Sequence, residues 1–128
     1  MDVEAAARAW VDGWSRAWPA GDADAVGALY APGASFRSHP FREPQPPQEY
    51  AAWAFADEDE QLVDLRFGDP IVGGDRAAVE WWAVVRRRSG GEATLAGFSA
   101  IRFGADGLAV DQRDYWAISE GRYPPNFH

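Results

Sequence analysis

Two polar residues in this chain have side chains suited to moving protons, His39 and Asp114. An imidazole titrates near neutral pH, so His39 is a candidate general base if it faces a cavity. Asp114 falls in a segment of period two, in which Val110, Gln112, Asp114, Trp116 and Ile118 share one face. A carboxyl among such neighbours has a raised pKa and can exchange protons.

Each of these candidates also has a structural interpretation. His39 can make a structural hydrogen bond at the end of a strand or face water, and Asp114 can form an ion pair with an arginine such as Arg102. Arg37 and Arg42 flank His39 and could recognise an acidic substrate, although most such arginines are solvated. His128 is the last residue and is treated as tail.

Other catalytic and cofactor chemistries have no matching pattern in the sequence. There are no cysteines, which excludes disulfides, thiolate metal sites and cysteine nucleophiles. The acidic residues and the two histidines do not show metal-ligand spacing. No glycine pair precedes a helix as a phosphate-binding loop requires. We therefore expect neither a metal nor a cofactor.

Aromatic residues are abundant, at 14% of the chain. Large aromatic side chains fill cores first and line pockets second. Simple core packing is the alternative for any one of them, but as a set they predict an aromatic-lined pocket for a small apolar or aromatic molecule. The predicted lining residues are Trp14, Trp18, Tyr30, Trp53, Trp82, Phe98 and Trp116.

Length and charge limit the class of protein. A chain of 128 residues is the size of one domain, which we assign to residues 1–128. The formal net charge is -8 and the basic residues are mostly scattered, which argues against binding to nucleic acid. No apolar run is long enough for a membrane span, and the N-terminus is acidic where a signal peptide would be basic. A cytoplasmic protein that binds no membrane is expected.

The elements that would position these residues read as helices followed by strands. Helical periodicity predicts a helix over residues 2–18 with Asp2 as its N-cap, a short helix capped by Asp22, and a third helix over about 48–57. Period two predicts strands over residues 34–38, 62–72, 76–87, 93–103 and 108–118. This order indicates an α+β fold. The long strands carry bulky residues on both faces, so a homodimer is expected to cover the outer one.

Three motifs, in this order, resemble the nuclear transport factor 2-like superfamily, in particular its SnoaL-like and ketosteroid-isomerase-like branches. They are AGDADAVGALYAPGASF, VGGDRAAVEWW and GFSAIRFGADGLAVDQRDYW, and the resemblance spans nearly the whole chain. It implies a curved antiparallel sheet wrapped as a cone around three N-terminal helices, with an apolar pocket at its open end. It does not imply one activity, because relatives include isomerases, dehydratases, cyclases, epoxide hydrolases and binding domains.

The resemblance also implies roles for particular positions. The isomerase branch has a catalytic aspartate directly before a proline at the end of the first strand. Here His39 stands before Pro40, at an offset of one residue. The same branch stabilises an oxyanion with a tyrosine of the first helix, and the matching position, seven residues before Gly21, holds Trp14. An indole has an N–H donor but no ionisable hydroxyl, which argues against steroid isomerisation. In the SnoaL-like branch an acid on a late strand exchanges protons, and Asp114 stands at a similar place.

Two functional hypotheses remain open at this point. The first is a cofactor-free acid–base enzyme acting on a small apolar cyclic compound by isomerisation, cyclisation, dehydration or hydrolysis. In it, His39 moves the proton and Asp114 orients His39 or acts as the acid. The second is a non-catalytic small-molecule binding or dimerisation domain. If His39 and Asp114 open onto one cavity the enzyme hypothesis gains, and if they do not it weakens.

Overall fold

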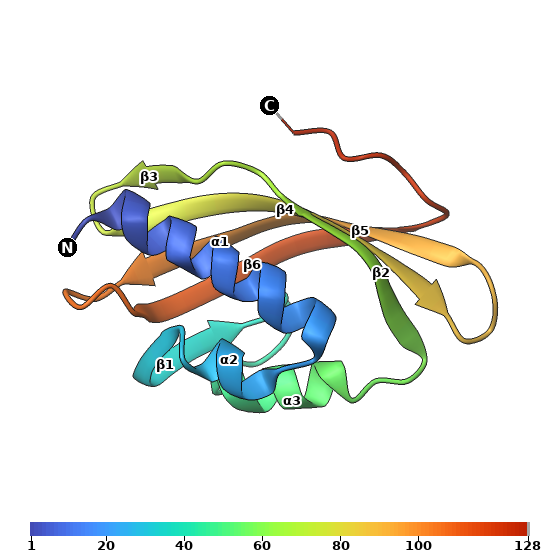
Figure 1. Ribbon diagram of the computed structural model, residues 1–128, viewed down its shortest axis with the longest axis horizontal. Coiled ribbons are helices and arrows are strands. Elements are labelled where there is room, and N and C mark those ends of the chain that lie inside the picture. Colours follow the sequence, from blue (N-terminus) through green and yellow to red (C-terminus); the bar gives the residue numbers. More distant parts are fainter. Residues whose placement is uncertain (128) are drawn as a thin grey trace.

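The computed structural model describes residues 1–127, and His128 lies outside the described residues. Those residues form three helices and a curved sheet of six strands (Figure 1). This confirms the predicted α+β class. The elements are α1 (Val3–Ala20), α2 (Ala23–Gly27), β1 (Tyr30–Arg37), α3 (Pro47–Phe55), β2 (Glu60–Phe67), β3 (Ile71–Gly73), β4 (Arg76–Arg87), β5 (Glu92–Phe103) and β6 (Ala109–Glu120).

Helix α1 begins where the sequence predicts it. The Asp2 carboxylate accepts a hydrogen bond from the Ala5 backbone N–H at 3.2 Å, which satisfies one of the free donors of the first turn. The helix continues past Trp18 through Pro19 and ends at Gly21, whose φ of 63° is the left-handed conformation that glycine adopts without strain. The helix is therefore two residues longer at its C-terminal end than predicted.

The strands differ from the prediction at two places. β1 begins at Tyr30, four residues earlier than predicted, and pairs in parallel with β6 through an irregularity between Tyr30 and Ser35. The predicted strand over residues 62–72 is two strands, β2 and β3, which both pair with β4. The intervening residues 68–70 include Pro70, which has no backbone N–H to donate to a ladder.

The sheet order is β1-β6-β5-β4-β2, and α1 lies across one face of it (Figure 1). We call this the inner face and the opposite one the outer face. The main core fills the space between α1 and the inner face, with Trp10, Val79 and Ile101 among its buried members. Because side chains alternate along a strand, the inner residues of β4, β5 and β6 are fixed by the register of the ladders.

The chain after β6 turns back over the outer face. Trp82 donates its indole N–H to the Tyr123 carbonyl at 2.8 Å, and the Thr94 hydroxyl donates to the Gly121 carbonyl at 2.8 Å. The Phe127 ring meets the Trp82 ring edge-on, with centroids 6.4 Å apart. This segment covers part of the face for which we expected a partner subunit. The homodimer itself stays a prediction.

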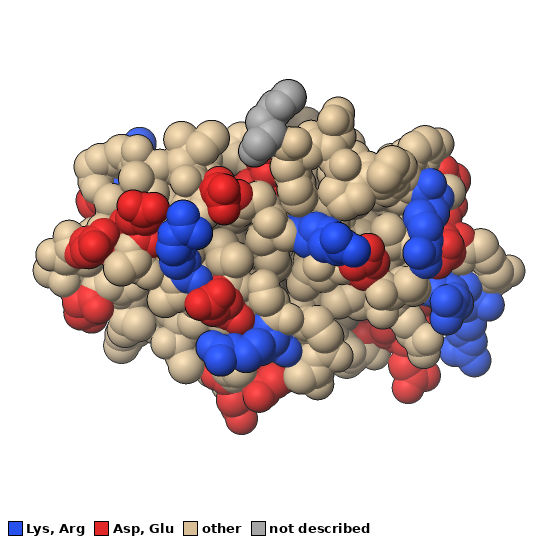
Figure 2. All heavy atoms as spheres, turned by 45° about the horizontal axis from the view of Figure 1, so that its top comes forward, with Lys and Arg blue, Asp and Glu red and all other residues tan. Residues whose placement is uncertain are grey.

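Charged side chains are mixed on the surface. On the face shown in Figure 2, arginines lie beside aspartates and glutamates and form no continuous basic patch. Ion pairs such as Arg122–Glu92, at 2.6 Å, and Arg87–Glu120, at 2.8 Å, have this arrangement. None of the helices within residues 1–127 has the length and apolar character that crossing a membrane requires.

Candidate functional site

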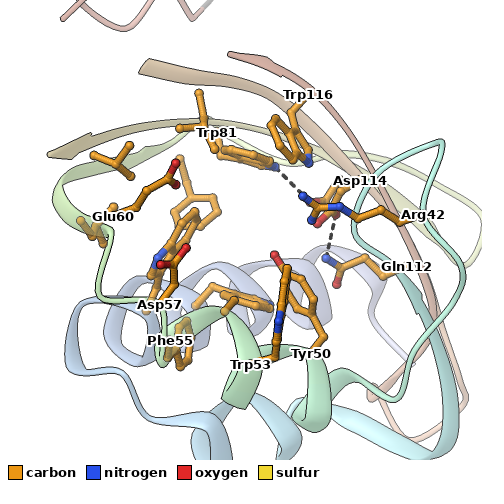
Figure 3. Close-up of a pocket in the computed structure, with 18 of the residues that line it drawn as sticks. Arg42, Tyr50, Trp53, Phe55, Asp57, Glu60, Trp81, Gln112, Asp114 and Trp116 are labelled. Carbon is orange, nitrogen blue, oxygen red and sulfur yellow. Dashed lines mark hydrogen bonds between the residues drawn. The ribbon is translucent and has the colours of Figure 1, made fainter. Parts of the chain in front are cut away.

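A cavity of about 460 Å³ lies between the helices and the inner face of the sheet. Its walls come from helices α1 and α3, from the segments between β1 and α3 and between α3 and β2, and from strands β2, β4, β5 and β6. This volume is typical of a small-molecule site. In Figure 3 the rings of Tyr50, Trp53, Trp81 and Trp116 surround the space, with Arg42, Gln112 and Asp114 on one side and Asp57 and Glu60 on the other.

The walls are mainly aromatic. Six of the seven tryptophans line the cavity, and Trp82 is the exception. Trp10, Trp14 and Trp18 recur every four residues on α1, so the helix places all three on one side, with ring centroids 6.2 Å apart in each successive pair. Rings packed in this way make the floor of the cavity apolar.

Asp114 lies beside Gln112 at one end of the cavity (Figure 3). It is 9% exposed and belongs to the inner face of β6, directly opposite Ser99 of β5. Its Oδ1 accepts hydrogen bonds from the Ser99 hydroxyl at 2.6 Å and from the Gln112 amide Nε2 at 2.9 Å. No fully buried side-chain oxygen or nitrogen of residues 1–127 lacks a partner. Oδ2, which makes no hydrogen bond to these residues, therefore opens onto the cavity.

The two donors to Asp114 are themselves fixed. The Trp81 indole donates to the Ser99 oxygen at 3.1 Å, and the Ser99 hydroxyl in turn donates to Asp114 at 2.6 Å. Gln112 accepts at Oε1 from the Trp10 indole at 2.9 Å and from the Tyr30 hydroxyl, which sets the amide with its Nε2 toward Asp114. Every hydrogen bond in this network is thus donated in the direction of Asp114.

Burial changes the titration of this end of the cavity. It raises the pKa of Asp114 to about 7, and the hydrogen bonds from Ser99 and Gln112, which favour the carboxylate, limit the rise. Burial also raises the pKa of Tyr50 to about 12, with the Asp114 charge acting in the same direction and Arg42 opposing it. The pKa of Tyr30 is raised well above its ordinary value for the same reason, so Tyr30 is a neutral hydrogen-bond donor.

Arg42 reaches the cavity from the segment between β1 and α3. Its guanidinium carbon lies 5.7 Å from the Trp53 ring centroid and 5.5 Å from the Trp116 ring centroid, and Nη1 donates to the buried Ser38 hydroxyl at 3.1 Å. Of the two arginines that flank His39, only Arg42 lines the cavity. Arg37 instead donates from Nη1 to the Arg42 carbonyl at 3.0 Å.

The structure does not bring His39 and Asp114 together at the cavity. Asp114 lines it, whereas His39 does not. The His39 Nδ1 accepts the Phe41 backbone N–H at 3.3 Å, and the ring meets the Trp116 ring edge-on with centroids 4.9 Å apart. These contacts match the structural interpretation of His39. The ion pair considered for Asp114 is also absent within residues 1–127, where its partners are Ser99 and Gln112.

The seven predicted lining residues divide into three groups. Trp14, Trp18, Trp53 and Trp116 line the cavity. Tyr30 does not, because its hydroxyl is held in the buried network below the floor. Trp82 and Phe98 do not line the cavity, which corrects the prediction. Trp82 follows the inner residue Trp81 and Phe98 precedes the inner residue Ser99, so alternation along the strands places both on the outer face.

Sequence reasoning missed several residues of the site. Trp81, Ser99 and Gln112 fix Asp114, and Trp10 and Tyr50 line the cavity beside it. The period-two pattern around Asp114 included Gln112 and so carried part of this information. Ser99 gave no signal, because only the pairing of β5 with β6 sets it opposite Asp114.

Solved structures with the same fold are known at low sequence identity. The epoxide hydrolase/cyclase-like enzyme SalBIII, studied for pyran ring formation in the polyether salinomycin, has a TM-score of 0.73 and 16% identity over 88% of this chain and 94% of its own. A computationally designed 17-OHP binder has a TM-score of 0.70 and 20% identity over 91% and 98%. An LEH-like epoxide hydrolase of M. tuberculosis has a TM-score of 0.68 and 13% identity over 89% and 84%.

These likenesses show the fold and not the activity, since proteins of one fold carry out many functions. No curated protein matches the sequence significantly. The family, however, is settled by sequence, because the profile of the SnoaL-like domain matches residues 7–112, most of the chain. The resemblance expected from the three motifs is confirmed: the chain belongs to the SnoaL-like domain family of the nuclear transport factor 2-like superfamily.

Proposed function

We propose that the protein is an acid–base enzyme that acts on a small apolar cyclic compound without a cofactor, and that Asp114 carries the proton. The observation that carries the proposal is the asymmetry of the Asp114 carboxyl. Oδ1 is held by Ser99 and Gln112, and Oδ2 faces an aromatic cavity. A carboxyl whose pKa is raised to about 7, in an aromatic-lined cavity, is suited to general acid–base catalysis.

The hydrogen-bond directions fix where the proton is held. Because Oδ1 already accepts two hydrogen bonds, a proton on the protonated carboxyl resides on Oδ2, where it points at a bound compound. The ionised carboxylate instead presents Oδ2 as a base. Arg42 and Tyr50 line the same cavity and would stabilise negative charge that develops on a carbonyl or epoxide oxygen. His39 takes no part in proton transfer in this proposal and serves to pack against Trp116.

Two of the structures with the same fold are named as epoxide hydrolase-like enzymes, which supports acid–base chemistry at the level of the family. Isomerisation, cyclisation, dehydration and hydrolysis all need a proton to be removed at one atom and returned at another. We therefore propose proton transfer, the step that these reactions share, and not one particular reaction.

Exchange of carbon-bound hydrogen tests this step directly. In D₂O at about pH 8, the native chain should speed deuterium incorporation at the carbons beside the carbonyl of 2-tetralone, followed by NMR. Asp114→Asn should slow it by about 10²-fold or more, because the amide cannot accept the proton. Asp111→Asn is the matched control on the same strand, since Asp111 contacts Arg113 and does not line the cavity. Equal exchange by the Asp114 and Asp111 variants would refute the proposal.

The second candidate is a non-catalytic small-molecule binding domain. One observation favours it: a designed binder has this fold, at a TM-score of 0.70, so the cavity architecture is sufficient for binding alone. A thermal shift with cyclic ketones, together with no exchange above the rate in buffer, is the outcome expected for this candidate.

A further inference from the structure

We propose that Arg42 determines the specificity of the cavity, and that it selects a ligand whose apolar ring system carries a carboxylate. This inference names the substrate class for the function proposed above and rests on it.

Neighbouring side chains hold the guanidinium of Arg42 in position, but no carboxylate of the described residues pairs with it. It lies within 6 Å of the centres of two indole rings, those of Trp53 and Trp116, and one of its five N–H groups donates to Ser38. Within residues 1–127, no carboxylate comes within 4.0 Å of Arg42. A partly buried guanidinium held between aromatic rings, with N–H donors still available, is suited to binding an anion.

The segment around Arg42 holds this arrangement in place. The Arg42 backbone N–H donates to the His39 carbonyl at 3.0 Å, and its carbonyl accepts from Arg37 at 3.0 Å. Trp116 is anchored by its own indole N–H, which donates to the Ser38 carbonyl at 2.6 Å. Both the arginine and one of the two rings beside it are therefore set before a ligand arrives, which lowers the entropy cost of binding.

None of the three carboxyl groups that line the cavity pairs with Arg42. Glu60 pairs with Arg87 at 3.0 Å, and Asp57 accepts the Asp59 backbone N–H at 2.9 Å. Asp114 accepts from Ser99 and Gln112 through Oδ1. Arg42 is therefore free to pair with an anion that the ligand carries.

The distribution of charged residues along the cavity sets the orientation of a bound ligand. In Figure 3, Arg42 and Asp57 with Glu60 lie on opposite sides of the open space. Asp57 and Glu60 repel a carboxylate at one side of the cavity. At the other side Arg42 attracts it, and the protonated form of Asp114 beside Arg42 adds no opposing charge, so the apolar body of the ligand lies between the aromatic walls. Arg42 is also the only arginine lining the cavity within the described part of the chain. One cation matches a singly charged carboxylate better than a doubly charged phosphate.

Calorimetric titration with 2-naphthoate and its neutral analogue 2-naphthamide tests this inference. The native chain should bind the carboxylate at least about tenfold more tightly than the amide. In Arg42→Met, which keeps an unbranched apolar side chain and removes the charge, the ratio should fall to about one. Arg102→Met makes the same change at an exposed site of β5 and should keep the ratio. Arg42→Lys, a milder change, should give an intermediate ratio.

The inference is overturned if the native chain does not bind naphthoate measurably, binds both probes equally, or keeps its preference in Arg42→Met. Asp114→Asn separates this inference from the proposed function, because it should abolish exchange on 2-tetralone and leave the carboxylate preference intact. A preference that survives Arg42→Met, beside exchange that requires Asp114, would remove the inference and keep the function. A carboxylate preference that requires Arg42, without any hydrogen exchange on 2-tetralone, would keep the inference and remove the proposed function.

Discussion

A carboxyl group has two equivalent oxygens in water, and the environment of Asp114 makes them different. Ser99 and Gln112 occupy one oxygen, and the cavity receives the other. The same burial that raises the pKa of Asp114 to about 7 also couples the proton to folding. The residue therefore has consequences for stability that can be measured without a substrate.

The first prediction concerns the stability of Asp114→Asn as a function of pH. Because the folded-state pKa is raised from 3.8 to about 7, the contribution of Asp114 is full below the unfolded value and is lost as pH rises through the folded one. From about pH 5 to about pH 8 the native chain should lose on the order of 2 kcal/mol of unfolding free energy that the variant does not lose. Urea unfolding at both pH values measures this, and parallel curves for the two proteins would contradict it.

A second prediction concerns Ser99. Its hydroxyl stabilises the charged form of Asp114, so Ser99→Ala should raise the pKa of Asp114 still further. The pH at which exchange on 2-tetralone reaches half its maximum should then move upward. Thr94→Ala is a control on the same strand, because its hydroxyl bonds to Gly121 on the outer face. A profile that shifts equally in both variants would assign the effect to general loosening of β5.

The sequence predicted β4, β5 and β6, which carry Trp81, Ser99 and Asp114, more accurately than β1, β2 and β3. The predicted spans for β4, β5 and β6 agree with the structure to within two residues at each end, because alternation is strong there. The span over residues 62–72 was wrong in part, because Pro70 interrupts the ladder and starts a separate short strand. The start of β1 was placed late because Pro32 and Gly33 look like a stop signal, whereas they fall in the irregular part of the strand.

Gly97 shows how tightly two of these strands approach. A Cβ at this position would lie 2.0 Å from the Tyr115 carbonyl oxygen and 2.6 Å from the Trp116 Cα, both backbone atoms that cannot move alone. We predict that Gly97→Ala destabilises the fold by more than about 3 kcal/mol or prevents folding. Gly73→Ala, with nothing within 4 Å of the added carbon, should cost less than about 1 kcal/mol. Comparable melting temperatures for the two variants would contradict this prediction.

At the scale of the whole molecule, the fold class followed from element order and motifs, and the site followed only in part. Asp114 and four of the predicted tryptophans line the cavity, because a strand face and a helix face can be read from periodicity. The role expected for His39 rested on its position beside Pro40, and position along the chain does not say which way a side chain turns. Trp81 and Gln112 acquire their roles from contacts between distant segments, which no local pattern contains.

The expected homodimer is a prediction at this same scale. Phe98 and Tyr115 stack on the outer face with centroids 5.3 Å apart, and each is 39% exposed. If a second copy covers them, Phe98→Glu should shift the protein from dimer to monomer in sedimentation experiments, because it places charge in an apolar contact. Arg16→Glu makes a charge change at an exposed residue of α1, away from the outer face, and serves as the comparison. A native chain that sediments as a monomer at all concentrations would contradict the prediction.

The six tryptophans of the cavity wall also give the protein an optical signal of its own. Indoles whose rings are about 6 Å apart, as in the Trp10–Trp14, Trp14–Trp18 and Trp18–Trp81 pairs, exchange excitation energy, so light absorbed by one can be emitted by another. An aromatic guest whose absorption overlaps indole emission would accept that energy and reduce the emission of the cluster, while Trp82 on the outer face would supply a steady background. Occupancy of the cavity can therefore be followed by intrinsic fluorescence, with no label attached.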